Sequence, residues 1–260
     1  MGARNGLSGS LAIVGIGETE YVRRSERDVK SLIIDAVMRA LDDAGISPGE
    51  VDGIITEGMM TPNYFLADDL AEQMGFSLRY NATFSSIAPG MAYTPLMAAM
   101  AIREGLADVI VSYFGVDWGS SAEGPYAYHK VYPAKGSFEA PYGFYGQPSY
   151  FGMIASRYMH EYGLTSRQLA SVALTQRRHA LLNGNAQMRK PITYEDYEMS
   201  RVVADPLRVL DCCLLTDGAA AFVMCSPERA ANCKQPPVYM MGAGYHCAPN
   251  LGKLHIRPEP

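Results

Sequence analysis

Residues 11–56, LAIVGIGETEYVRRSERDVKSLIIDAVMRALDDAGISPGEVDGIIT, carry the pattern that decides the fold. The apolar run at 11–16 predicts a buried strand, and residues 27–44 place apolar side chains at the 3.6-residue spacing of an amphipathic helix. Gly45 ends that helix, and residues 51–56 form a second apolar run. Strand, helix and strand in this order make a βαβ unit, which implies parallel strands covered by helices.

The same alternation continues toward the C-terminus. By length and apolar spacing, further strands are predicted at 78–82, 109–114, 219–225 and 238–242, and further helices at 68–74, 88–104, 149–161, 166–182 and near Glu195. The strand at 109–114 is apolar almost throughout, as a central parallel strand should be. Asp217 and Gly218 are predicted to form a turn before the strand at 219–225. The fold class is therefore α/β.

Residues 117–150 have a different composition. They are rich in Gly, Pro, Ser and Tyr and show no clear periodicity. Disordered linkers are poor in aromatic residues, so this stretch is predicted to be ordered and to fold over a functional surface.

Composition excludes several classes of function. The net charge of −5 argues against nucleic-acid binding, which needs clustered Lys and Arg. The five cysteines form no disulfide framework, no apolar run reaches the ~18 residues of a membrane span, and no secretory signal opens the sequence. The histidines do not have the spacing of metal ligands, and the sequence has neither a glycine-rich dinucleotide-binding loop nor the GxSxG motif of hydrolases. We therefore expect a cytoplasmic protein with no membrane contact, no metal and no cofactor.

Residues 85–90, SSIAPG, lie between a predicted strand and a helix of small residues. Ser85 or Ser86 can cap that helix, and Pro89 and Gly90 both suit its first turn. The free N–H groups of a helix start favour negative charge, such as the oxyanion of a thioester carbonyl. On the local residues alone, an ordinary capped helix is the stronger interpretation.

Two further motifs each allow a structural interpretation. Cys212 and Cys213 are adjacent but have no base beside them in sequence, which favours buried structural cysteines over a nucleophile. Arg177 and Arg178 form a basic cluster at helical spacing. A solvated helix face is the simpler interpretation, and contact with a phosphate is the alternative.

Taken in order, several stretches resemble the thiolase superfamily, specifically thiolases of the sterol-carrier and lipid-transfer type. They are VGIGET at 14–19, ALDDAGI at 40–46 with VDG at 51–53, AIREGLAD at 101–108, and residues 180–221 with NAQMRKPIT and DPLRVLDCCLLTDGAAA. The resemblance covers nearly the whole chain.

The resemblance implies a thiolase-like fold in which each subunit has two similar halves. Each half is a βαβαβαββ unit, and the first carries an inserted loop domain. The expected domains are an N-terminal thiolase-like domain at 11–116, the inserted loop domain at 117–205, the closing strand of the first domain at 206–236, and the start of a second half at 237–260. The motifs of that second half are not in the sequence, so we expect either a fragment or a fold completed by another polypeptide.

The resemblance also locates the position of the family's nucleophilic cysteine. That cysteine lies in a pattern like Ser-Cys-Ala-Ser-Gly, which aligns with residues 86–90 and places Ile87 at the cysteine position. An alkyl side chain can neither attack a thioester nor leave as a thiolate, so acyl transfer through this position is excluded. A neighbouring serine would need a base, and the sequence shows none.

The closest resemblance is to the lipid-transfer-protein-like steroid side-chain aldolases, which work without the thiolase cysteine and pair with a small OB-fold protein. It implies retro-aldol cleavage of a β-hydroxyacyl-CoA into a ketone and a shorter acyl-CoA. Tyrosines supply the acid and base in that branch, and the candidates here are Tyr245 and Tyr113, each of which could equally be a packed tyrosine. Arg177, Arg178 and Arg189 are the candidate contacts to CoA phosphates.

Two other functions stay open at this point. One is a non-catalytic thiolase homologue that binds lipid or acyl-CoA, because such a protein would also lose its nucleophile. The other is a conventional acetyl-CoA acyltransferase. The resemblance further implies a homodimer that pairs the third strands, at residues 78–82.

Overall fold

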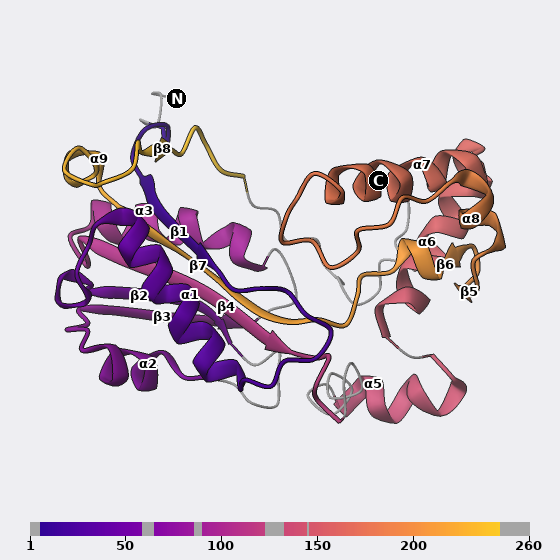
Figure 1. Ribbon diagram of the computed structural model, residues 1–260, viewed down its shortest axis with the longest axis horizontal. Coiled ribbons are helices and arrows are strands. Elements are labelled where there is room, and N and C mark those ends of the chain that lie inside the picture. The colour runs from indigo at the N-terminus through magenta and orange to yellow at the C-terminus, as the bar shows by residue number, and fades with distance from the viewer. Residues whose placement is uncertain (1–5, 59–64, 86–89, 123–132, 145, 245–260) are drawn as a thin grey trace. The chain divides into compact units, whose positions relative to one another are not determined.

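The computed structural model describes residues 6–58, 65–85, 90–122, 133–144 and 146–244 (Figure 1). The chain divides into two compact units. The first comprises residues 1–121 and 216–245, and the second comprises residues 122–215 and 246–260. The predicted domain boundaries, with an insertion at 117–205, stay a prediction about domain organisation.

The first unit is built on a six-stranded sheet with the order β3-β2-β4-β7-β1-β8. The strands are β1 (Ala12–Glu18), β2 (Gly53–Gly58), β3 (Tyr80–Ser85), β4 (Val109–Asp117), β7 (Asp217–Cys225) and β8 (Val238–Tyr239). Strand β2 pairs in parallel with β3 and β4, whereas β7 is antiparallel to both β4 and β1. The first four strands therefore run in one direction, as the βαβ pattern predicts. The mixed sheet arises because β7 is inserted between β4 and β1 in the opposite sense.

Helices cover both faces of this sheet. They are α1 (Val29–Ala44), α2 (Ala67–Met74), α3 (Thr94–Arg103) and α9 (Pro227–Ala230), with 3₁₀ turns η1 (Pro48–Glu50) and η2 (Gly90–Tyr93). Ile54 packs in the core cluster that contains α1 and α2, and its neighbour Ile55 packs in the cluster that contains α3. Because successive strand residues point to opposite faces, α3 lies on the other side of the sheet from α1 and α2. The predicted helices and strands of this unit are confirmed with shifted ends, except that residues 90–93 of the helix predicted at 88–104 form the 3₁₀ turn η2; helix α9 was not predicted.

Two glycines allow α1 to lie directly on β1. A Cβ at Gly15 would lie 2.3 Å from the carbonyl oxygen of Ala40, and a Cβ at Gly17 would lie 2.1 Å from that of Ala36. Both distances are far below van der Waals contact with helix backbone. The glycines of the GIG motif therefore serve close helix–strand packing, which agrees with the absence of a dinucleotide loop.

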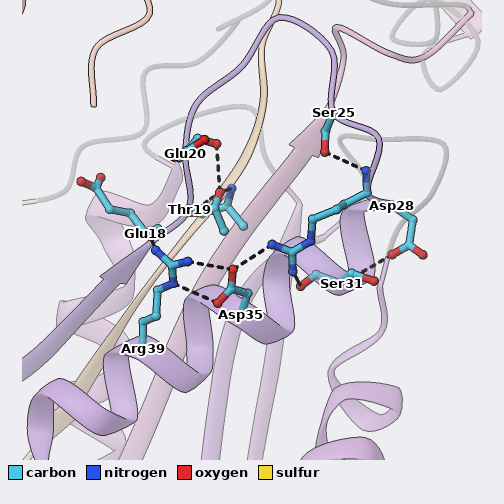
Figure 2. Close-up of polar contacts among 10 residues, drawn as sticks. Glu18, Thr19, Glu20, Ser25, Asp28, Ser31, Asp35 and Arg39 are labelled. Atoms are coloured by element: carbon cyan, nitrogen blue, oxygen red, sulfur yellow. Dashed lines mark hydrogen bonds and ion pairs between the residues drawn. The ribbon is translucent and has the colours of Figure 1, made fainter. Parts of the chain in front are cut away.

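Polar contacts hold the first turn of α1 at the surface. Asp28 caps the helix and accepts from the N–H of Ser31 at 2.7 Å. Asp35 lies between Arg27 at 2.8 Å and Arg39 at 2.9 Å, and Figure 2 shows it beside Arg39. The hydrogen bond from Arg27, followed by that from Arg39, lowers the pKa of Asp35. Such exposed pairs contribute little stability, so the buried face of α1 carries most of its attachment.

Asp217 is fully buried and belongs to β7, so the predicted turn at Asp217 and Gly218 is wrong. Its carboxylate accepts from the N–H groups of Gly119 at 2.7 Å, Ser120 at 3.1 Å and Ser25 at 2.7 Å. Gly218 follows in the strand, and a Cβ there would meet the ring of Tyr21 at 2.5 Å. Long-range contacts, which local turn preferences cannot register, extend the strand through both residues.

The second unit is mostly helical. Its elements are α5 (Pro133–Phe138), η4 (Ala140–Tyr142), α6 (Gly146–Tyr162), α7 (Ser166–Ala180), α8 (Tyr194–Met199), β5 (Val202–Ala204), β6 (Leu207–Arg208) and η5 (Val209–Asp211). The three helices predicted after residue 148 are confirmed, and α7 begins at a capping box formed by Thr165 and Gln168. The short hairpin of β5 and β6 was not predicted. Among the described residues, none of the helices combines the length and apolar character that a membrane crossing requires.

Candidate functional site

The candidate site lies at the carboxyl ends of β2, β3 and β4. In the parallel pairing of β2 with β3, Glu57 lies beside Phe84 and Gly58 beside Ser85. Ligands of open α/β sheets bind outside this end of the strands. Ser86 and Ile87 lie outside the described residues, so their predicted places at the helix start stay predictions.

Gly90, the third residue predicted for this site, begins η2 with φ +60°. The carboxylate of Glu57 lies directly over it, since a Cβ on Gly90 would be 2.9 Å from Glu57 Oε2. The left-handed backbone conformation is the feature that favours glycine at position 90, because the atom that a Cβ would meet is the end of the flexible Glu57 side chain. The negative charge of the Glu57 carboxylate would repel a second anion bound beside Gly90.

Sequence reasoning did not identify Glu57. The signal available was a charged residue at the carboxyl end of a mostly apolar parallel strand. By alternation along β2, Glu57 shares the α3 face with Ile55, which packs in the α3 cluster. Ser112 of β4 lies opposite Ile55 on the same face, where its hydroxyl donates to the Ile55 carbonyl at 2.7 Å. Met91 approaches that hydroxyl with its sulfur at 4.0 Å.

Tyr113 lies on the other face of the sheet. It is 2% exposed, packs in the cluster of α1 and α2, and its hydroxyl donates to the carbonyl of Phe65 at 3.1 Å. The structure therefore does not bring Tyr113 together with Gly90. Tyr245 lies outside the described residues, and its catalytic role stays a prediction.

In the second unit, the three candidate CoA contacts lie at the end of α7 and in the loop after it. Arg177 donates to the carbonyl of Lys190 at 2.8 Å, and Arg189 donates through Nε to the carbonyl of Ala186 at 2.8 Å. Arg178 is exposed. The contact between Arg177 and Lys190 joins the end of α7 to the polar loop. The binding of CoA by these residues stays a prediction.

The RVLD part of the DPLRVLDCC motif takes part in a partly buried polar network in the second unit. Tyr197 is fully buried, and its hydroxyl donates to Asp211 Oδ2 at 2.8 Å. The same oxygen accepts from the Arg208 N–H at 2.7 Å, while the Arg208 guanidinium donates to the Ser200 carbonyl at 2.7 Å and pairs with Glu198 at 3.3 Å. Burial and the bond to Asp211 raise the pKa of Tyr197, which keeps it protonated. The motif thus has a structural role.

Cys212, which lies beside this network, lacks the environment of a nucleophile. Cys212 is partly buried, its thiol lies 3.5 Å from the Arg208 carbonyl, and burial raises its pKa. A raised pKa disfavours the reactive thiolate. Cys213 is exposed. In the part of the chain that the structure describes, no group of three His, Cys, Asp or Glu residues is arranged to hold a metal ion.

No family model matches the chain. It is 38% identical over 265 residues to a 17-hydroxy-3-oxo-4-pregnene-20-carboxyl-CoA lyase of Mycobacterium tuberculosis, a match that covers 97% of this chain and 67% of the relative. It is 36% identical over 245 residues to a steroid side-chain-cleaving aldolase of Thermomonospora curvata, covering 91% and 62%.

Solved structures agree with these relatives. A structure described as an Ltp2-ChsH2(DUF35) aldolase superposes with a TM-score of 0.79 at 35% identity, covering 91% of this chain and 60% of that one. A monomeric SCP2-thiolase-like protein of Mycobacterium smegmatis shares the fold, with a TM-score of 0.65 at 16% identity, covering 88% and 48%. This chain thus spans about two thirds or less of the length of each of these four proteins.

Proposed function

Because the chain belongs to the sterol-carrier-type branch of the thiolase superfamily, together with the steroid side-chain-cleaving aldolases, we propose that it cleaves a β-hydroxyacyl-CoA by a retro-aldol reaction. The observation that carries the proposal is 38% identity to a lyase of this kind over 97% of the chain. The isoleucine at position 87 supports it, because a retro-aldol cleavage needs no covalent acyl intermediate.

The proposed substrate is a CoA thioester whose β-carbon carries a hydroxyl group, of the steroid side-chain class. A base removes the hydroxyl proton, the bond between the α- and β-carbons breaks, and its electron pair passes to the thioester as an enolate. The β-carbon leaves as a ketone, and the shorter acyl-CoA takes up a proton. The thioester itself is the electron sink, so the proposal needs no metal or organic cofactor.

The tyrosine candidates differ in the support they receive. The hydroxyl of Tyr113 is engaged with Phe65 in the core, on the face of the sheet opposite Glu57. The proposal therefore assigns the role of the acid that donates a proton to the enolate to Tyr245 rather than to Tyr113. For the CoA phosphates it assigns Arg177, Arg178 and Arg189.

The proposed assembly has two parts. A small OB-fold partner is supported by the solved relative, which is described as a complex of Ltp2 with ChsH2. A homodimer through β3 is supported by the position of this strand at the edge of the sheet, where no other strand of the described residues pairs with its outer side. We also propose a cytoplasmic location, supported by the free cysteines at 212, 213, 225 and 233.

The test uses the complete natural protein with its OB-fold partner and a steroid β-hydroxyacyl-CoA. Release of the ketone and the shorter acyl-CoA, followed by mass spectrometry, is the expected result. The matched control is the same thioester without the β-hydroxyl, which should not react. Binding of the thioester without cleavage would overturn the proposal in favour of a non-catalytic homologue. A mass increase of the protein by one acyl group would overturn it in favour of an acyltransferase.

A further inference from the structure

We propose that Asn183 and Gly184, in the polar loop after α7, form a site of spontaneous modification. At this site the side-chain amide of Asn183 is converted to a carboxylate through a cyclic imide. The site lies between Arg178 and Arg189 in sequence, two of the candidate contacts to CoA. The modification goes beyond the proposed function and does not rest on it.

The first observation is the residue that follows Asn183. Glycine has no Cβ to hinder the approach of its main-chain nitrogen to the preceding side-chain amide, so asparagine followed by glycine closes a cyclic imide most readily. This pair occurs at 183–184 and at 5–6, and Asn5 lies outside the described residues. The other described asparagines, at 81, 185 and 232, precede alanine or cysteine.

The second observation is the freedom of Gly184. Asn183 and Gly184 are both exposed and belong to neither a helix nor a strand. A Cβ at Gly184 would meet nothing within 4 Å, so no neighbouring group fixes this residue. Among the described residues, none accepts a hydrogen bond from the Gly184 N–H, whereas the N–H groups of Asn185 and Ala186 both donate to Asn183. The nitrogen that has to attack is therefore not held by pairing.

The third observation is the orientation of the Asn183 side chain. The N–H of Asn185 donates to Asn183 Oδ1 at 2.9 Å. The ring that this Asx turn closes contains the Gly184 nitrogen, so the side-chain amide is folded over the peptide group that it has to meet. The same hydrogen bond stabilises the negative charge that develops on Oδ1 during the attack.

The reaction needs only hydroxide and water. Hydroxide removes the proton of the Gly184 nitrogen, which then bonds to Cγ of Asn183. The bond between Cγ and Nδ2 breaks, and the leaving nitrogen takes a proton from water and departs as ammonia, which restores the hydroxide. Water then opens the cyclic imide at either of its carbonyls and leaves aspartate or isoaspartate. One water is consumed and one ammonia is released, and the rate rises with pH.

The product places a new negative charge in the loop. The N–H of Ala186 donates to the Asn183 carbonyl at 3.1 Å, and the carbonyl of Ala186 accepts from Arg189 at 2.8 Å. The new carboxylate therefore belongs to the same short loop as Arg189, where it competes with a phosphate for the guanidinium groups. We expect the modified protein to bind CoA less tightly, a consequence that rests on the assignment of Arg177, Arg178 and Arg189 to the CoA phosphates.

Peptide mass spectrometry of the folded protein, incubated at mildly alkaline pH, tests the site. Asn232 is the internal control, because it is also exposed but the next N–H, of Cys233, donates to the carbonyl of Ala230 at 3.1 Å. Asn183 should convert to aspartate and isoaspartate at least about tenfold faster than Asn232, which requires a difference of only about 1.4 kcal/mol in activation free energy. Equal rates at the two asparagines would overturn the proposal.

Gly184→Ala is the matched variant. Alanine fits at this position because its Cβ has open space and φ is not in the left-handed region, so the variant should fold like the wild type. Its methyl group hinders the attack on Asn183, and we expect the conversion to slow by at least about tenfold. A folded Gly184→Ala protein that converts at the wild-type rate would rule out the cyclic imide.

A titration with CoA tests the consequence. Asn183→Asp should raise the Kd for CoA by about two- to fivefold, the size of an exposed charge interaction, and added salt should reduce the difference. The neutral variant Asn183→Gln should bind CoA as the wild type does. An unchanged Kd in Asn183→Asp would overturn the effect on CoA and leave the modification standing. A wild type that binds no CoA would overturn both this effect and the assignment of the three arginines.

Discussion

The contact between β1 and α1 offers a sharp test of the packing at Gly17. Replacing Gly17 with Ala adds one methyl group, whose carbon would lie 2.1 Å from the Ala36 carbonyl oxygen and 2.5 Å from the Ala40 nitrogen. Both are backbone atoms of α1, so no side-chain rotation can relieve the overlap. The helix must move away from the strand by about 1 Å to restore ordinary contact distances.

The cost follows from what that movement separates. Ala36 and Ala40 are fully buried in the main core cluster, and a gap of about 1 Å removes up to about half of each contact's dispersion energy. Adding a methylene to a tight core typically costs about 1–3 kcal/mol. Because the obstacle is backbone, we expect Gly17→Ala to lose about 3 kcal/mol or more.

Urea unfolding followed by circular dichroism measures this loss. Gly49→Ala is the matched control, because a Cβ at Gly49 meets nothing within 4 Å and its φ is not in the left-handed region. It should be neutral or stabilising by up to about 1 kcal/mol. A Gly17→Ala protein within about 0.5 kcal/mol of the wild type would refute the proposed packing.

Three further predictions concern single side chains. Asp217→Asn should lower the free energy of unfolding, measured in urea, by about 2–4 kcal/mol, because an amide side chain has one acceptor oxygen where the carboxylate accepts on two. The control Asp42→Asn, on the exposed side of α1, should change it little. Equal stability of the two variants would contradict the role of Asp217. Burial, and then Glu18, raises the pKa of Tyr21 from 10.0 to about 12, so in this pH window the unfolded state loses its proton first and stability falls as the pH rises. Unfolding measured between pH 9 and pH 12 should show a smaller fall in Tyr21→Phe, and identical curves would contradict this. Burial raises the pKa of Cys225 to about 12, so iodoacetamide at about pH 8 should modify exposed Cys213 and spare Cys225 in the native protein; peptide mass spectrometry showing equal modification would count against it.

The sequence was a good guide to the elements of the first unit because their signals are local. The 3.6-residue stripe of α1 and the apolar runs of β1 and β4 mark a helix and strands wherever they lie. The order of the strands has no such local signal. The antiparallel placement of β7 between β4 and β1 depends on contacts between residues about two hundred positions apart in sequence, such as the hydrogen bond from Ser25 to Asp217. The same long-range contacts made the predicted turn at Asp217 wrong.

The candidate site was less accessible to sequence reasoning. The resemblance located the region through position 87, and Gly90 was predicted within it. Glu57 was missed because it is more than thirty residues from Gly90 in sequence and becomes adjacent only when β2 and β3 pair. Conversely, the adjacent cysteines at 212 and 213, a candidate motif in the sequence, lie next to the structural polar network around Tyr197.

The antiparallel ladder between β4 and β7 offers a route to a minimal version of this protein. Its register runs from Val109 opposite Cys225 to Asp117 opposite Asp217, so the chain leaves one strand and returns directly across from it, as in a hairpin. Replacing residues 122–215 with a short turn would keep both strands and the loop at 119–120 that Asp217 binds. Each halving of the connecting loop also reduces its closure entropy by about 0.6 kcal/mol, so the shortened chain should fold as a smaller scaffold that retains Glu57 and Gly90.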